Sequence, residues 1–387
     1  DEQGKIAHLV AKDKIAESGD YNLSGDRYRE NTSINTEYKL TPIGDFIIEQ
    51  SDRVRDNKNI PVWSVSNKDG FINTEIQFSK RVASKDTGNY KIIRKNYFAY
   101  NPSRINVGSI AFNKSDNVGC VSPMYVVFSA DETKVNTHYL FIMMKSKMIN
   151  EEIIRLAQGS VRTQLKFKDL SSIKIPLPPL EVQKEIVEQI EVKQKAIEAA
   201  KAVIENLERE RRYFGHQLRK LKDVEWVELG EVCVVDWGNT ELTKKSYVEN
   251  GEYLGVSAAG CDGRMKHFEH EVGTVVLSAI GANCGRVFYP DEKFTAIKNT
   301  ITFTPDKKKL YPKFLFYILN NNTLPKRGGG QPFMTKGDVK KYKIPLPPLE
   351  VQRQLVAEME EQEKIIEANK KLIKIMEQKI AEVLNDI

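Results

Sequence analysis

The 387-residue sequence is poor in cysteine and histidine and has no long apolar run. Its four cysteines (Cys120, Cys233, Cys261 and Cys284) show no CxxC spacing, which favours reduced thiols and argues against a zinc site. No apolar stretch approaches the roughly 18 residues that a membrane span needs. Because no signal peptide follows the first residue, Asp1, we expect a cytoplasmic chain without a membrane partner.

Sequence motifs of catalytic sites are also absent. There is no glycine-rich phosphate loop and no dinucleotide fingerprint. The run Asn101–Arg104 (NPSR) begins like an amino-methyltransferase signature but lacks its second proline and its stacking aromatic residue, and Pro290–Lys293 (PDEK) resembles a nuclease fragment but is expected to be a polar turn. His267 and His270 have no third ligand at metal spacing. The sequence predicts neither a catalytic residue nor a metal site.

Composition permits folded domains and a polyanionic partner. Lys and Arg number 59 against 53 Asp and Glu, and 40% of the residues are hydrophobic. That apolar content is enough for real cores, and the length suggests two or three domains. The mild excess of positive charge is compatible with nucleic-acid binding but does not establish it.

An identical ten-residue block occurs twice. Lys174–Gln183 reads KIPLPPLEVQ, and the same residues return 169 positions later (343 − 174) at Lys343–Gln352. Prolines hold each block extended, and Glu181 and Glu350 suit the positive end of a helix that begins there. The chain is therefore a tandem repeat of a globular unit followed by a helix.

After each block, apolar residues recur in steps of three and four. Such heptads with charged flanks are typical of a coiled coil, with each helix about 55–60 Å long. A lone helix of this kind could be a solvated spacer, but two copies in one register favour pairing within the chain. The expected seam comprises Ile190, Ile197, Ile204, Leu207 and Leu218 in the first helix and Met359, Ile366, Ile373, Met376 and Ile380 in the second.

Other helix positions do not belong to this seam. Polar residues interrupt the heptads and are expected to fix the register, whereas surplus apolar residues are expected to accept further helices. The first group is Lys193, Arg211, Gln362 and Asn369, and the second is Val187, Val203, Ile365 and Leu372.

The repeat defines the expected domains. Residues 1–37 form an N-terminal arm, with a short helix at Lys5–Glu17. Residues 38–173 and 223–342 form two similar globular units, and residues 174–222 and 343–387 form the two helical regions. In the globular units short β-type runs precede a helical segment, which is His138–Leu156 in the first unit. We predict an α+β fold in which two similar domains are separated by two long antiparallel coiled-coil helices, with a pseudo-twofold internal repeat.

Basic residues lie among aromatic residues and amides in both globular units. Lys and Arg neutralise phosphates, while Arg, Asn and Gln can read base edges. A solvated charged surface accounts equally well for most single positions, and Arg327–Gly330 could surround a phosphate or be only a hinge. The candidate DNA-binding residues are Arg94, Lys95, Arg104, Arg162, Gln164, Arg264, Lys266, Arg286, Lys326, Arg327 and Gln331.

Over residues 38–387 the chain resembles the specificity subunit of Type I restriction–modification enzymes. The resemblance rests on the twin blocks with their heptad helices, the unit openings Gly44-Asp45 and Gly230-Glu231, and the approaches Gly159–Arg162 and Gly328–Thr335. In the first approach, Val161–Gln164 departs from the Gly-Gln-Pro pattern of the second. Asp20–Glu30 (DYNLSGDRYRE) also resembles sequence near methylase–specificity junctions, so the arm is either a docking segment or a frayed tail.

The resemblance implies a non-catalytic subunit with two target-recognition domains, each reading one half of a bipartite double-stranded DNA target. It implies that the helices set the half-site spacing and dock two methyltransferase subunits, with restriction subunits joining that core. This chain would bind no cofactor, because S-adenosylmethionine belongs to the methyltransferase subunit, and ATP and Mg to the restriction subunit. Two alternatives are a coiled-coil adaptor whose units bind protein and a stand-alone enzyme that transfers methyl groups by itself.

Overall fold

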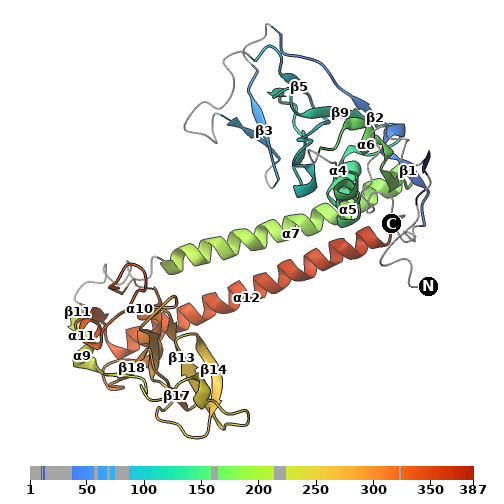
Figure 1. Cartoon of the computed structure of the whole chain (residues 1–387). Coiled ribbons are helices and arrows are strands. Elements are labelled where there is room, and N and C mark those ends of the chain that lie inside the picture. Colours follow the sequence, from blue (N-terminus) through green and yellow to red (C-terminus); the bar gives the residue numbers. More distant parts are fainter. Residues whose placement is uncertain are drawn as a thin grey trace. The chain divides into compact units, whose positions relative to one another are not determined.

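In the computed structural model, each KIPLPPLEVQ block joins a short strand to a long helix (Figure 1). The first block forms β10 (Lys174–Pro176) and enters α7 (Leu180–Arg212), and the second forms β19 (Lys343–Leu346) and enters α12 (Leu349–Asn385). Glu181 and Glu350 lie in the first helical turns, so the predicted helix entry is confirmed. At 1.5 Å per residue, these helices are about 50 and 55 Å long.

The structure describes residues 10, 12–13, 37–55, 60–67, 70–74, 87–157, 164–212, 224–321 and 324–387. The helix expected at Lys5–Glu17 and the loop after it lie almost wholly outside these residues. By its internal contacts the chain divides into unit 1 (residues 1–196 and 375–387) and unit 2 (residues 197–374). Both long helices therefore contribute to both units.

Unit 1 contains a four-stranded antiparallel sheet in the order β2-β9-β6-β7, formed by Ile47–Glu49, Val126–Ala130, Tyr97–Tyr100 and Ile110–Phe112. Two smaller pairs join β3 (Trp63–Ser66) to β4 (Gly70–Asn73) and β5 (Lys91–Ile93) to β8 (Gly119–Val121). Strand β1 (Leu40–Pro42) pairs with β10, so the start of the unit is hydrogen-bonded to the block that ends it. The helices are η2 (Ile43–Asp45), η3 (Ile105–Val107), α4 (Thr137–Lys145), α5 (Lys147–Ala157) and α6 (Phe167–Ser172).

Unit 2 repeats this plan. Its four-stranded sheet has the order β12-β18-β15-β16, formed by Cys233–Trp237, Thr300–Pro305, Val275–Ser278 and Val287–Phe288. The hairpin of β13 (Tyr253–Ser257) and β14 (Gly260–Met265) extends through β17 (Phe294–Ala296), and β11 (Glu225–Glu228) pairs with β19. The helices are α9 (Leu229–Val232), η4 (Lys244–Ser246), α10 (Pro312–Asn321) and α11 (Lys336–Lys340).

Matched positions in the sequence occupy matched positions in the two units. The pair Ser66 and Gly70 of β3 and β4 corresponds to the pair Ser257 and Gly260 of β13 and β14, and Asp169 and Asp338 each lie in the first turn of the short helix before the block. The prediction of an α+β fold with an internal repeat is therefore confirmed.

One helix prediction was wrong in detail. The segment His138–Leu156 forms two helices, α4 and α5, instead of one. Ser146 between them has extended backbone angles, and its hydroxyl accepts a hydrogen bond from the Ile149 N–H at 3.3 Å. Serine in this position satisfies a free N–H at a helix start, which favours a new helix over continuation of the old one.

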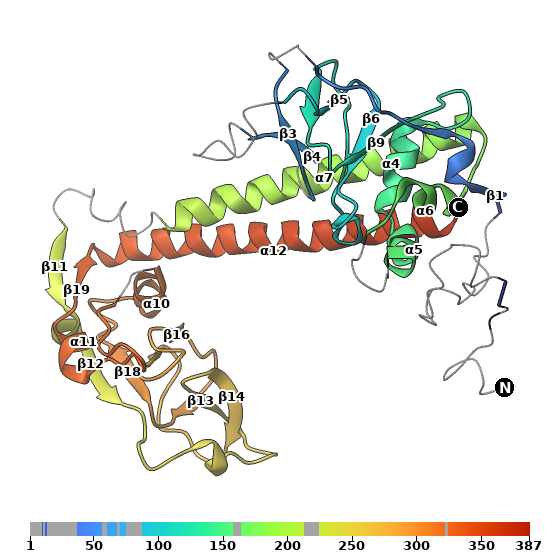
Figure 2. The ribbon, with the colours of Figure 1, turned by 45° about the horizontal axis from the view of Figure 1, so that its top comes forward.

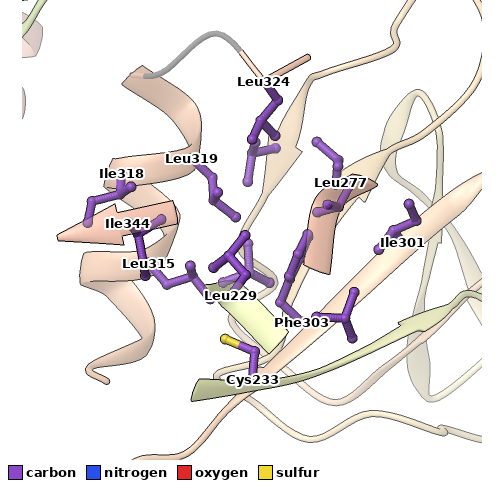
Figure 3. Close-up of a cluster of buried hydrophobic side chains, with 14 of the residues drawn as sticks. Leu229, Cys233, Leu277, Ile301, Phe303, Leu315, Ile318, Leu319, Leu324 and Ile344 are labelled. Carbon is purple, nitrogen blue, oxygen red and sulfur yellow. The ribbon is translucent and has the colours of Figure 1, made fainter. Parts of the chain in front are cut away.

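The core of unit 2 lies between α10 and the four-stranded sheet (Figure 3). Leu315, Ile318 and Leu319 of α10 share a buried cluster with Leu277 of β15 and Phe303 of β18. An equivalent cluster in unit 1 joins α4 to β6 and β9. Helices α4 and α10 are thereby fixed on the sheets of their units.

Gln183 and Gln352, the last residues of the two blocks, are completely buried. The Gln352 side chain accepts a hydrogen bond from the Tyr311 N–H at 2.7 Å and donates to the carbonyl groups of Lys309 and Pro347 at 2.9 and 2.7 Å. Gln183 makes the same three contacts in unit 1, with Asn136, Lys134 and Pro178. Each glutamine thus joins the start of a long helix to the start of α4 or α10.

Contacts between α7 and α12 occur within each unit. In unit 1, Ile186 and Ile190 from the start of α7 share a cluster with Ile380 and Leu384 from the end of α12 (Figure 2). In unit 2, Arg211 at the end of α7 donates to Glu363 of α12 at 2.7 Å. The contacts run in opposite order along the two helices, as in an antiparallel pair.

The expected seam residues are mostly covered. Ile190, Ile197, Met359 and Ile366 are buried, Ile204, Leu207, Ile373, Met376 and Ile380 are half-buried, and Leu218 lies outside the described residues. Of the residues expected to fix the register, Arg211 and Gln362 contact the facing helix, whereas Lys193 and Asn369 donate to carbonyl groups of their own helices.

The surplus apolar positions differ between the units. Val203, Ile365 and Leu372 are exposed, as expected for residues that could accept further helices. Val187 was assigned wrongly, because it is buried in the core of unit 1 and cannot accept another helix.

Gly44 and Gly230 are matched glycines with different surroundings. A Cβ atom on Gly44 would lie 2.9 Å from Cβ of Ser171 and 3.0 Å from its carbonyl oxygen, whereas one on Gly230 would lie no closer than 3.4 Å to Lys340. We expect Gly44→Ala to destabilise unit 1 by about 1–3 kcal/mol through overpacking, and Gly230→Ala to have a smaller effect. Urea unfolding of both variants measures the difference; equal losses would contradict it.

Candidate nucleic-acid interface

Two neighbouring loops of unit 2 carry four of the candidate DNA-binding residues. The first loop, residues 279–286, links β15 to β16, and the second, residues 326–333, follows α10. The Gly281 N–H donates to the Pro332 carbonyl at 2.9 Å, and the Met334 N–H donates to the Ala279 carbonyl at 2.8 Å. These hydrogen bonds fix the two loops against each other, and we call them together the basic loop pair.

The second loop is a small hairpin. Arg327 and Phe333 exchange backbone hydrogen bonds of 2.8 and 2.9 Å, which closes residues 328–332 into a turn. Gly328 has a φ of +81°, a conformation that glycine adopts without strain. Residues 328–331 are all exposed. The hairpin therefore presents its backbone to the surroundings.

The side chain of Lys326 in the second loop packs on Gly285 of the first loop. A Cβ atom on Gly285 would meet Cε of Lys326 at 2.8 Å, so the lysine stem lies across that glycine. Arg286 donates to the Asn283 side chain at 3.2 Å and remains exposed, as do Lys326 and Gln331. The loop pair is thus an exposed basic surface that also presents an amide.

Arg327 is held in place. Its guanidinium donates to the carboxylate of Asp338, which also accepts a hydrogen bond from Thr335 at 2.7 Å. The bond from Thr335, together with Arg327, holds the pKa of Asp338 below its ordinary value. This orientation fixes Arg327 at the start of α11 and neutralises part of its charge.

Tyr247, which follows η4 and which the sequence analysis did not single out, packs on the β13–β14 hairpin. The ring of Tyr247 covers Gly255 and Gly263, where a Cβ atom would lie 2.5 and 2.0 Å from it. Its hydroxyl donates to Asp262 at 2.9 Å. Although burial raises the pKa of Asp262, hydrogen bonds from Lys244, Ser257 and Tyr247 hold it below its ordinary value. In the sequence, Gly255 and Gly263 were the available signal for this contact, because glycines leave room for an aromatic ring.

Arg264 lies on β14 and Lys266 directly follows that strand, and both residues are exposed. Arg264 donates to Glu292 at 2.9 Å. An arginine paired in this way must exchange its carboxylate for a phosphate or a base on binding. Surface ion pairs are worth little, so the exchange costs about 1 kcal/mol or less.

The candidate DNA-binding residues of unit 1 lie on separate segments. Arg94 and Lys95 lie in the turn between β5 and β6 and pair with Asp52 and Asp116 at 3.6 and 2.9 Å. Arg104 is exposed next to η3, and Gln164 precedes Leu165, whose N–H donates to the Pro102 carbonyl. Arg104 and Gln164 thus lie on adjoining segments, whereas Arg162 lies outside the described residues.

The motifs set aside in the sequence have structural roles. The side chain of Asn101 accepts a hydrogen bond from the Ser103 N–H at 3.0 Å and is buried, so it stabilises a turn. Residues 290–293 form the polar loop between β16 and β17, as predicted. Burial lowers the pKa of His270, whose ring packs 5.0 Å from that of Phe294. Among the described residues, no three His, Cys, Asp or Glu side chains are grouped to hold a metal ion.

The repeat is also visible by comparison with known proteins. The model of a family described as Type I restriction modification DNA specificity domain matches residues 36–209 and again 221–385. Each match covers one globular unit with the helix that follows it. The chain belongs to the Type I restriction–modification DNA specificity family. It contains two copies of the specificity domain, and no helix in the described ranges has the length and apolarity to cross a membrane.

Relatives and a solved structure agree with this family assignment. A protein named as a type I restriction enzyme specificity subunit of Methanocaldococcus jannaschii is 24% identical over 353 residues, covering 81% of this chain and 82% of the relative. One named as a type I specificity subunit of Mycoplasma pneumoniae is 25% identical over 51% of this chain and 58% of its own length. The crystal structure of a Type I restriction–modification S subunit from M. genitalium matches 93% of this chain and 98% of the chain in that crystal structure. The TM-score is 0.58 at 15% sequence identity, which shows a shared fold.

Proposed function

We propose that this chain is the non-catalytic DNA sequence-recognition subunit of a Type I restriction–modification complex. Each globular unit reads one half of a bipartite double-stranded target, and the helices set the distance between the halves. The observation that carries the proposal is the duplication, since the same strand order occurs twice and each copy precedes the same block and helix. Two readers on one chain are suited to a target with two parts.

The exposed basic residues divide into two kinds of contact. Arginine and lysine of the basic loop pair lie beside bare backbone, which suits phosphate binding. The β13–β14 hairpin presents Arg264 on β14, with Lys266 directly after the strand, and a strand pair is an element that can enter a major groove and read base edges. Phosphate contacts would fix the position of unit 2 on DNA, and hairpin contacts would select the bases.

Two methyltransferase subunits are the proposed partners on the helices, with restriction subunits joining them. A chain with two equivalent surfaces suits two copies of one partner. Unit 1 has a groove between α4 and the long helix α7, unit 2 has one between α10 and the long helix α12, and matched side chains line both grooves. They are His138, Phe141 and Glu191 in unit 1 and Lys313, Phe316 and Glu360 in unit 2. The exposed Val203, Ile365 and Leu372 add apolar area for the same contact.

The chemistry of the complex is assigned to these partners. We propose that S-adenosylmethionine is bound by the methyltransferase subunits, and ATP and Mg by the restriction subunits. The contribution of this chain is to place the partners on a chosen sequence. It needs no cofactor for that task, because recognition rests on hydrogen bonds and charge.

Methylation mapping of genomic DNA tests the proposed function. Deleting the gene is expected to remove one bipartite methyladenine motif from the methylome, and restoring the gene should bring it back. The mapped motif also gives the two half-sites and the spacer. An unchanged methylome under confirmed expression would contradict the proposal and favour a coiled-coil adaptor, and methyl transfer by the isolated chain would favour a stand-alone enzyme.

A further inference from the structure

Three consecutive glycines form the tip of the hairpin in the basic loop pair, and only the first is required by the fold. Gly328 has positive φ, and a Cβ atom on it would meet the Gln331 carbonyl oxygen at 2.7 Å. Gly329 and Gly330 have no positive φ, and nothing lies within 4 Å of the position that a Cβ atom would occupy. Alanine would therefore fit the folded chain at both positions.

Glycine at such positions has a cost. It leaves the unfolded chain more conformational freedom, so an exposed glycine that alanine could replace lowers stability by about 0.4–1 kcal/mol. Glycine also allows another molecule to approach the backbone closely. Since the fold of this chain does not require Gly329 and Gly330, close approach by a ligand explains them.

The backbone at this tip is free to bind an anion. Within the described part of the chain, the N–H groups of Gly329, Gly330 and Gln331 have no hydrogen-bond acceptor. Consecutive N–H groups in a turn form a concave site for anionic oxygens. The four residues 328–331 are exposed, so such a site is accessible.

The charges on the basic loop pair favour an anion that is part of a charged polymer. Lys326 and Arg286 are exposed and form no ion pair with any described carboxylate, and Lys326 lies across Gly285, the residue before Arg286. The nearest carboxylate of the loop, Asp338, is engaged by Arg327 and Thr335. Two unpaired cations on the same loop pair as the free N–H groups match the phosphodiester of a nucleic-acid strand.

We propose that the bare backbone at Gly329–Gln331, with Lys326 and Arg286, binds a phosphate of the DNA backbone next to the half-site read by unit 2. This assignment rests on the proposed function and adds a role within it. The contact positions the unit without reading sequence, so it contributes equally to binding of any duplex. Sequence selection by unit 2 then comes from other residues.

The test compares the Gly329→Ala/Gly330→Ala double variant with the native full chain, each purified with its methyltransferase subunits. Duplexes carrying the mapped motif or a scrambled one are titrated over a range of salt concentrations. The double variant should lose about tenfold in affinity for both duplexes, as expected for one charge-assisted hydrogen bond, with the salt dependence unchanged. Lys326→Ala should lower both affinities and reduce the slope of log K against log salt by about 0.9, as expected for one released counterion.

Gly337→Ala is the matched control, because Gly337 is exposed on α11 and a Cβ atom on it would meet only Thr335 at 3.8 Å. It should bind as the native chain does, and thermal unfolding should show that all glycine variants are at least as stable as the native chain. Native affinity in the double variant would overturn the phosphate site, and so would a loss confined to the mapped motif, which would indicate base reading. If the native complex does not prefer the mapped motif, the proposed function fails instead.

Discussion

Replacing Gln352 by leucine is expected to destabilise unit 2 by about 3 kcal/mol or more. The change removes three hydrogen bonds and leaves the buried carbonyl group of Pro347, and the partly buried Tyr311 N–H and Lys309 carbonyl group, without these partners. Each unsatisfied buried group costs about 1–3 kcal/mol, whereas leucine fills a similar volume. Urea unfolding of the full chain measures the loss. Hydrogen exchange should locate it, with the amide of Tyr311 losing protection first.

Gln362→Leu is the control for this substitution. Gln362 also lies on α12, but its buried Oε1 has no hydrogen-bond partner among the described residues, and its Nε2 reaches Glu210 only at 3.5 Å. Removing this amide should leave stability unchanged or raise it by about 1 kcal/mol. Equal losses from the two substitutions would show that the contacts of Gln352 are not the source of stability. Gln183→Leu should repeat the effect of Gln352→Leu in unit 1.

Much of the fold follows from the repeated block. Prolines and Glu181 locate the start of α7, and Glu350 does the same for α12, because local backbone restriction and the helix dipole act within a few residues. Matched glycines and strand runs then predict that the second unit has the topology of the first. Local sequence rules therefore predict where the two long helices begin.

Features that depend on tertiary contacts could not be predicted from the sequence as well. Val187 fits the apolar pattern of an exposed helix face, yet the core of unit 1 covers it. Gln183 and Gln352 look like ordinary polar helix residues, and only the folded chain shows that they join two helix starts. Ser146 divides a segment whose apolar pattern is continuous, because a cap competes with helix continuation.

For the candidate DNA-binding residues too, the sequence predicts the local property but not the tertiary contact. The sequence indicates that Arg286 and Arg327 are basic and near glycine, but not that loops 279–286 and 326–333 are hydrogen-bonded together. Conversely, Arg94 and Arg264 carry the same sequence signal and prove to be paired with Asp52 and Glu292. Charge is visible in a sequence, whereas the partner that neutralises it is not.

Removing one heptad from both long helices is expected to shorten the spacer of the DNA target. The ion pair of Arg211 with Glu363, and the position of Gln362 opposite Glu210, show which residues face each other in unit 2. Counting from them in opposite directions, residues 200–206 of α7 face residues 368–374 of α12. Deleting both segments removes about 10 Å of each helix and keeps the heptad phase. The permitted spacer should decrease by about one to three base pairs.

Rotation limits how far that shift can go. Each base pair removed turns the second half-site by about 35° around the DNA axis, whereas removing a heptad turns a straight helix by only about 20°. The shortened chain should therefore methylate a shorter target more slowly than the native chain methylates its own, with both half-sites unchanged. Methylation mapping measures the spacer directly, and an unaltered spacer would reject the helices as its determinant. Deleting only residues 200–206 is the control; it leaves helices of unequal length and should abolish methylation at every spacer, because the seam can no longer close.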